Sequence, residues 1–151
     1  MIRALATADI APLAGRLATL PLMVRYRRTR EAIELDLGAA LARSDGLLVW
    51  DAGSGADGLC WFQPSGTLGL GGYLKLLAIA TGGEGRGAGA ALLAGFEAAV
   101  ATHSRHAFLL VSDFNHGAQR FYQRHGYREV GRLPALVLPD VDELVLWKRL
   151  R

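Results

Sequence analysis

The sequence has one cysteine, Cys60, in 151 residues, and no hydrophobic run approaches the ~20 residues that a membrane-spanning helix requires. A single cysteine excludes an intramolecular disulfide, and its place in an apolar run predicts a buried core side chain. The first residues, Met1-Ile2-Arg3-Ala4, lack the layout of a signal peptide. We therefore expect a protein of the reducing cytoplasm that has no membrane partner.

An excess of charge of one sign is also missing. The 17 Lys and Arg residues against 14 Asp and Glu give a net charge of only +3, and the basic residues are scattered, which argues against a nucleic-acid partner. The densest basic cluster, Arg25, Arg27, Arg28 and Arg30, fits either a solvated loop or a surface that attracts an acidic substrate. The four histidines have no metal-ligand spacing, so no metal site is expected.

Length and apolar content predict a single domain over residues 1–151 with its own core. Apolar residues at helical spacing predict helices over residues 9–20, 29–43, 87–103 and 115–125. Short apolar runs between turn residues predict strands over residues 2–6, 47–50, 59–62, 72–80, 107–111, 128–133 and 143–150. Residues 22–28 are expected to form a loop, and Pro64-Ser65-Gly66 to close the strand before it. This order indicates a mixed α/β layout around one central sheet.

A glycine-rich turn stands between the strand predicted over residues 72–80 and the helix that follows it. Five glycines fall between Gly82 and Gly89, and Arg86 lies among them. Glycine lets a backbone turn tightly and approach a ligand closely. The first N–H groups of a helix lack partners within it, and the helix dipole makes that end partly positive. The stretch therefore predicts an anion site suited to phosphate.

Three interpretations of this turn compete. A purely structural turn usually needs one or two glycines rather than five. A dinucleotide fingerprint, G-x-G-x-x-A, is satisfied by residues 85–90, with Asp113 as its acid, but some eighty residues precede it and too few follow for a doubly wound sheet. The third interpretation is acyl-CoA binding, and residues further along the chain favour it.

Two stretches together resemble the Gcn5-related N-acetyltransferase (GNAT) superfamily. Residues 84–89 resemble its Q/R-x-x-G-x-G/A motif, with Gly87 and Gly89 at the small positions and Glu84 in place of Gln or Arg. A second signature of that family has matching residues at the expected spacing: Asn115, Ala118, Tyr122, Gly126 and Tyr127. The resemblance covers the chain from end to end. It implies a mostly antiparallel sheet of six to seven strands with a splay between the fourth and fifth strands, flanked by four helices.

The resemblance also implies acetyl-CoA as the cofactor. Its pantetheine arm would bond to the backbone of Leu77, Ala78 and Ile79, as an added strand does. Its pyrophosphate would lie at the turn, held by backbone N–H groups of Glu84, Gly85, Arg86, Gly87, Ala88, Gly89 and Ala90. Asn115 is expected to bond the arm, to cap its own helix, or to do both.

For catalysis, the resemblance favours Tyr122 as the general acid that protonates the departing thiolate, although an aromatic on an apolar helix face is ordinarily a core residue. The Ile79 N–H is expected to help stabilise an oxyanion. No residue is marked as the general base. Tyr73 and Lys75 share a strand face with Leu77 and Ile79, so they are expected either to line the acceptor cleft or to be simply exposed. Glu84 is another possible base, although its nearness to the phosphates disfavours it. Of the histidines, His116, next to Asn115, is the one to test.

The acceptor is expected beside residues 22–28, where Tyr26 and Arg28 would seat a carboxylate or phosphate, unless this segment is only an exposed loop. The implied function is transfer of an acetyl group from acetyl-CoA to a primary amine of a small molecule or protein, directly and through a tetrahedral intermediate. The alternative function is that of a non-catalytic acyl-CoA-binding or sensor module. The third candidate function is that of a nicotinamide dinucleotide-binding enzyme. Dimers are common in the family, so a homodimer is compatible with the resemblance.

Overall fold

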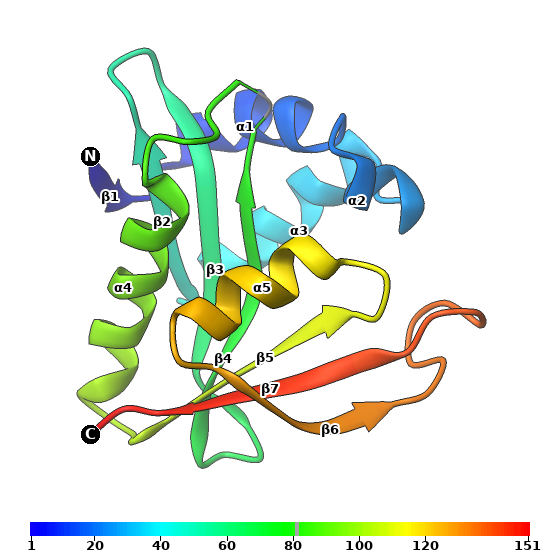
Figure 1. The fold of residues 1–151 in the computed structure, drawn as a ribbon. Helices are drawn as coiled ribbons and strands as arrows, with labels where there is room; N and C mark the ends of the chain where they lie inside the picture. Colours follow the sequence, from blue (N-terminus) through cyan, green and yellow to red (C-terminus); the bar gives the residue numbers. More distant parts are fainter. Residues whose placement is uncertain (81) are drawn as a thin grey trace. The chain divides into compact units, whose positions relative to one another are not determined.

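The computed structural model describes residues 1–80 and 82–151. In chain order the elements shown in Figure 1 are β1 (Ile2–Ala4), the 3-10 helix η1 (Thr7–Asp9), α1 (Ile10–Leu17), α2 (Pro21–Arg25), α3 (Arg30–Ala42), β2 (Gly46–Asp51), β3 (Ala56–Thr67), β4 (Gly71–Ile79), α4 (Ala88–Ala101), β5 (His106–Ser112), α5 (His116–Arg124), β6 (Arg128–Leu133) and β7 (Glu143–Arg149). The predicted order of strands and helices is confirmed, with α2 as an addition.

The seven strands form one sheet in the order β1-β2-β3-β4-β5-β7-β6. β4 and β5 are parallel, whereas β1–β2, β2–β3, β5–β7 and β6–β7 are antiparallel. A parallel pair needs a crossover, and α4 supplies it in Figure 1. In the parallel pair, residues 72–74 of β4 lie opposite residues 107–109 of β5. Beyond these residues β4 continues to Ile79 and β5 continues to Ser112. A doubly wound dinucleotide fold requires a mostly parallel sheet, so this topology argues against a nicotinamide dinucleotide-binding enzyme.

The chain divides into two compact units, one of residues Met1–Phe62 and Leu76–Ala98, the other of residues Gln63–Lys75 and Ala99–Arg151. In the first unit both faces of β2 and β3 are covered. Leu47, Val49, Leu59 and Trp61 pack with residues of α1 and α3 in one buried cluster. On the other face, the Phe96 ring of α4 meets Phe62 edge-on, with ring centres 5.3 Å apart. Burial on both faces explains why residues 59–62 are continuously apolar.

The second unit is built on β5 and β7, which pair along their whole length from His106–Arg149 to Ser112–Glu143. Its buried apolar side chains are Val100, Ala107, Leu109, Val111, Tyr122, Tyr127, Val141, Leu144 and Leu146. Gly72 of β4 lies directly against Val100, because a Cβ atom at Gly72 would come within 2.2 Å of Val100 Cγ2. Close packing of β4 against the end of α4 therefore depends on this glycine.

The turn predicted at Pro64-Ser65-Gly66 is wrong, because β3 continues through it to Thr67. The chain reverses instead at Leu68 and Gly69, whose φ angles are +55° and +70°, and the Leu70 N–H donates to the Thr67 carbonyl at 2.9 Å. Two positive φ angles with that bond define the hairpin turn that matches strand twist. In the sequence, Leu68-Gly69 is a weak signal for a hairpin turn, whereas Pro64-Ser65-Gly66 is a strong turn signal that is misleading here.

The other correction concerns the helices. The described residues contain five α-helices rather than four, because part of the loop predicted over residues 22–28 is helical. Pro21 begins α2 at the first helical position, where its missing N–H costs nothing, and the helix predicted to reach residue 20 ends at Leu17. Among the described residues, no helix combines the length and apolarity needed to cross a membrane.

Candidate functional site

The glycine turn lies in the first unit, between the end of β4 and the start of α4. Gly82, Gly85 and Gly87 have φ angles of +91°, +76° and +74°. Among the described residues, leaving aside the immediate chain neighbours, no atom lies within 4 Å of the position that a Cβ atom would take at any of them. The turn therefore requires glycine for its backbone conformation rather than for lack of space. The open space also leaves this backbone accessible to a ligand. Thr81, within the same stretch, lies outside the described residues.

The helix after the turn begins with free donor groups. Ala91 N–H donates to the Gly87 carbonyl at 3.0 Å, the first bond of the α4 ladder. By helix geometry the preceding N–H groups, those of Ala88, Gly89 and Ala90, have no acceptor within α4. The Arg86 side chain is exposed next to them. Amides, helix dipole and a fixed cation thus meet at one end of α4, which suits a phosphate group.

Glu84, the departure from the family motif, turns back onto the turn itself. Its carboxylate accepts a hydrogen bond from the Gly82 N–H at 2.7 Å. The negative charge that looks unfavourable beside phosphate therefore has a structural partner. No sequence pattern marks this bond, because it depends on the path of the turn between residues 82 and 84.

One hydrogen bond at the end of β4 indicates which of its backbone groups face β3. Ala80 N–H donates to the Asp57 carbonyl of β3 at 2.7 Å. Backbone groups of successive strand residues point to opposite sides, so the N–H and carbonyl of Ile79 and Leu77 point away from β3. The Ala78 side chain is buried in the core of the first unit. Leu77 and Ile79 can therefore offer main-chain groups to an extended ligand.

Asn115 and Tyr122 both belong to the second unit. Asn115 Oδ1 accepts a hydrogen bond from the Ala118 N–H at 3.2 Å, which makes it the N-cap of α5. Tyr122 is buried, and its ring meets the Tyr127 ring edge-on at 5.8 Å. Gly126, with a φ angle of +90°, ends the helix between them. The residues of the family signature therefore also form a packing unit. Asn115 caps the start of α5, and the Tyr122 ring near the end of that helix packs against Tyr127, which follows Gly126.

The pKa of Tyr73 is shifted by its surroundings, in a way that the sequence did not point to. Burial raises the pKa of Tyr73 above its usual range, and the negative charge of Glu143 is a second, smaller cause of the same shift. Glu143 is buried at the start of β7, opposite Ser112 in the register. An acidic residue at a strand end is ordinarily exposed, so no sequence pattern marks this one. Lys75, two residues after Tyr73, is exposed.

The residues predicted to meet the acceptor are partly engaged elsewhere. Arg28 forms an ion pair with Asp36 of α3, and Arg30 pairs with Glu34 at 2.8 Å. Tyr26 is half-buried after the end of α2, and Arg27 has a φ angle of +55°. The pairing of Arg28 reduces the charge available for an anionic acceptor. The basic cluster is therefore less basic than its sequence suggests.

Among the described residues, the predicted site coincides neither with a metal site nor with an apolar hollow that lies in the second unit. Among residues 1–80 and 82–151, no group of three or more His, Cys, Asp or Glu side chains is arranged to hold a metal ion. The hollow has a volume of about 360 Å³ and is lined by residues that include Leu68, Phe108 and Trp147. None of the predicted site residues lines it. The sequence motifs therefore point to a different region from this hollow.

Comparison with known proteins supports the resemblance. Residues 65–134 match the family model of the acetyltransferase (GNAT) domain, a segment that includes the glycine turn, Asn115 and Tyr122. No curated protein matches the sequence significantly.

Solved structures share the fold over nearly their whole length at low identity. A ribosomal-protein-alanine N-acetyltransferase from Brucella melitensis is 18% identical, with a TM-score of 0.78 over 99% of both chains. Ard1 from Thermoplasma volcanium is 21% identical, with a TM-score of 0.77 over 100% of this chain and 97% of its own. An aminoglycoside 6'-N-acetyltransferase complexed with coenzyme A is 15% identical, with a TM-score of 0.80 over 100% and 97%. Residues 65–134 thus match the acetyltransferase (GNAT) domain model, and the whole chain shares the fold of these acetyltransferase structures.

Proposed function

We propose that this protein transfers an acetyl group from acetyl-CoA to a primary amine. The observation that carries the proposal is the glycine turn: three positive-φ glycines with open space at their Cβ positions lead directly into a helix start whose first N–H groups have no acceptor within α4. Backbone amides at a helix N-terminus bind phosphate oxygens irrespective of side-chain identity. Such a turn suits the diphosphate of coenzyme A, and it lies within the segment that matches the GNAT family model.

In this proposal acetyl-CoA supplies the acetyl group as a thioester, which a neutral amine attacks directly through a tetrahedral intermediate. The Leu77 and Ile79 backbone groups that point away from β3 hold the pantetheine arm as an added strand. The Ile79 N–H also stabilises the oxyanion that develops on the carbonyl oxygen. Tyr122 gives its phenol proton to the departing sulfur, and Asn115 contributes a bond to the arm besides capping α5.

The direct test is thiol release from acetyl-CoA in the presence of a panel of amines. The protein's own thiol should not interfere, because Cys60 is fully buried and burial raises its pKa to about 12. We expect turnover with at least one amine. Coenzyme A binding without turnover on any acceptor, together with no effect of Tyr122→Phe, would favour a non-catalytic acyl-CoA-binding module instead. Calorimetry with coenzyme A and NAD side by side should show heat for coenzyme A alone.

The site of binding has its own test. Gly87→Asp places a side chain and a negative charge at the turn and should weaken coenzyme A binding by ~10-fold or more in calorimetry. Gly69→Asp is a matched control, because Gly69 has nearly the same φ angle, +70° against +74°, and equally open surroundings at the other end of β4. Equal losses in both variants, or none in either, would place the nucleotide elsewhere.

A further inference from the structure

The start of the glycine turn is attached to one residue of β3, Asp57. The Ala80 N–H donates to the Asp57 carbonyl at 2.7 Å, and the Gly83 N–H donates to the Ala80 carbonyl at 3.0 Å. Gly83 is buried, and a Cβ atom there would lie 3.7 Å from Asp57 Cβ. The described part of the turn nearest β4 therefore follows the position of Asp57.

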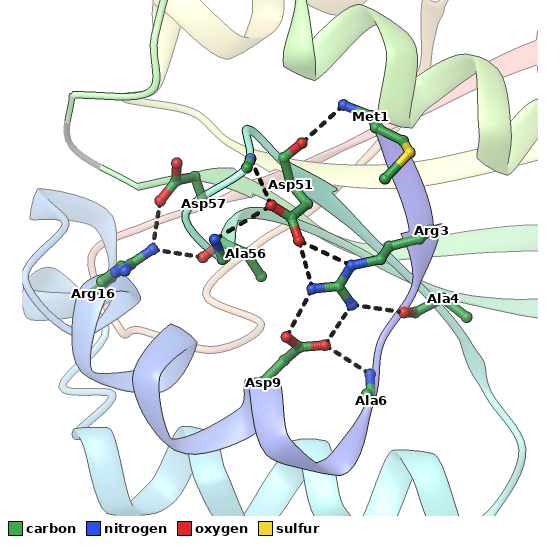
Figure 2. A network of polar contacts seen from close by, with 11 residues as sticks. Met1, Arg3, Ala4, Ala6, Asp9, Arg16, Asp51, Ala56 and Asp57 are labelled. Carbon is green, nitrogen blue, oxygen red and sulfur yellow. Dashed lines mark hydrogen bonds and ion pairs between the residues drawn. The ribbon is translucent and has the colours of Figure 1, made fainter.

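Asp57 is held in turn by a side chain from α1. Arg16 Nη1 donates both to Asp57 Oδ1 at 2.5 Å and to the Ala56 carbonyl at 2.9 Å, as Figure 2 shows. One guanidinium nitrogen thus joins the carboxylate of Asp57 and the backbone just before it. The contact spans 41 positions of sequence, so it fixes the start of β3 against α1.

We propose that the Arg16–Asp57 ion pair positions the glycine turn for phosphate binding, and this inference rests on the proposed function. Amide donors bind an anion tightly only when they already converge on it, because ordering them on binding costs free energy. Arg16 and Asp57 act through the backbone. Their ion pair fixes the start of β3, the Asp57 carbonyl accepts from the Ala80 N–H, and the Ala80 carbonyl accepts from the Gly83 N–H. They are positioning residues for the cofactor and take no part in proton transfer.

The test measures coenzyme A affinity and acetyl-transfer kinetics for Arg16→Met, Asp57→Asn and the double variant. Each should weaken coenzyme A binding by ~3- to 10-fold and raise KM for acetyl-CoA, with kcat unchanged. The double variant should lose no more than Arg16→Met alone, because that single change already removes both the ion pair with Asp57 and the bond to the Ala56 carbonyl. Arg16→Lys keeps a cation and should recover part of the affinity.

A second ion-pair network in the same unit provides the control. Arg3 bonds Asp9 at 2.7 Å and Asp51 at 2.9 Å, linking β1 to η1 and to the end of β2 (Figure 2). Among the described residues, the bonds of this network reach β1, η1, the end of β2 and, through the Gly53 and Gly55 N–H groups that donate to Asp51, the loop before β3, but not residues 82–87. Arg3→Met should therefore lower the thermal unfolding midpoint but leave coenzyme A affinity unchanged.

Three outcomes would overturn the inference. If Arg16→Met weakens binding while Asp57→Asn strengthens it, Arg16 contacts the phosphates directly and Asp57 only competes for its charge. If Arg3→Met lowers affinity as much as Arg16→Met does, the effect is one of general stability. If the wild-type protein binds no coenzyme A, the proposed function fails first, and the turn has no such ligand for the pair to position.

Discussion

At the scale of single residues, the two positions that look least suitable for the proposed chemistry are explained by their neighbours. Glu84 departs from the family motif, but its carboxylate bonds the Gly82 N–H within the turn. Tyr122 has the environment of a core aromatic, packed between Phe121 and Tyr127. Packing of the ring does not exclude a catalytic hydroxyl, because a buried ring also fixes where its hydroxyl points.

Tyr122→Phe separates these two roles. The ring keeps its packing, so the unfolding midpoint and coenzyme A affinity should stay close to wild type, while kcat falls by ~100-fold or more through loss of the acid. Tyr127→Phe, on the other ring of the edge-on pair, is the control and should leave kcat unchanged. Steady-state thiol release checks both. An unchanged kcat in Tyr122→Phe would assign this residue to the core alone.

Glu84→Gln tests the charge at the turn. Glutamine keeps an oxygen that can accept from the Gly82 N–H, but it removes a negative charge from the expected phosphate site. Coenzyme A should bind ~2- to 5-fold more tightly, as measured by calorimetry. Glu31→Gln, in the first turn of α3, should have no effect. Weaker binding in Glu84→Gln would mean that the full charge is needed to hold the turn.

At the scale of elements, identical substitutions have opposite effects according to what surrounds them. Gly38 is exposed inside α3, and among the described residues, leaving aside its chain neighbours and the nearby backbone of α3, no atom lies within 4 Å of its Cβ position. A Cβ at Gly72 of β4, in contrast, would meet Val100 at 2.2 Å. Val100 is β-branched and fully buried, so it has little freedom to move away.

We therefore expect Gly38→Ala to stabilise the protein by ~0.5–1 kcal/mol, through better helix propensity, and Gly72→Ala to destabilise it by ~1–3 kcal/mol, through overpacking. Unfolding in denaturant measures both. The two variants are matched in chemistry, so only their surroundings differ. A loss of stability in Gly38→Ala, or none in Gly72→Ala, would contradict the open space at the first position and the crowding at the second.

At the scale of the whole molecule, the open question is the number of domains. The two compact units are not continuous in sequence, because β3, β4 and α4 each contribute residues to both. Neither unit could therefore be cut out as one segment. The single domain over residues 1–151 stays a prediction.

The prediction is tested by calorimetry of the full chain. A single domain should unfold in one transition, with equal calorimetric and van't Hoff enthalpies. Urea unfolding followed by Trp fluorescence and by circular dichroism should then give coincident curves. Two resolved transitions would show that the units are separate folding domains. Addition of coenzyme A should raise the single midpoint, because a ligand bound only to the folded state stabilises it.

The sequence by itself determined the features that depend on neighbours within a few residues. Thr29 and Asn115 cap the predicted helices, each by accepting an N–H three residues on, and the glycines at positions 82, 85 and 87 adopt the positive φ angles that glycine favours. Caps, turns and apolar periods act over one or two turns of chain, so their signals survive in sequence alone.

Only the tertiary structure decided what depends on distant partners. β3 runs through Pro64, Asp36 pairs with Arg28, the charge of the buried Glu143 helps to raise the pKa of Tyr73, and Arg16 holds the residue to which the glycine turn is attached. Each of these depends on how the sheet and helices pack. Such contacts leave no periodic or local pattern, because either partner would look ordinary in its own stretch of chain.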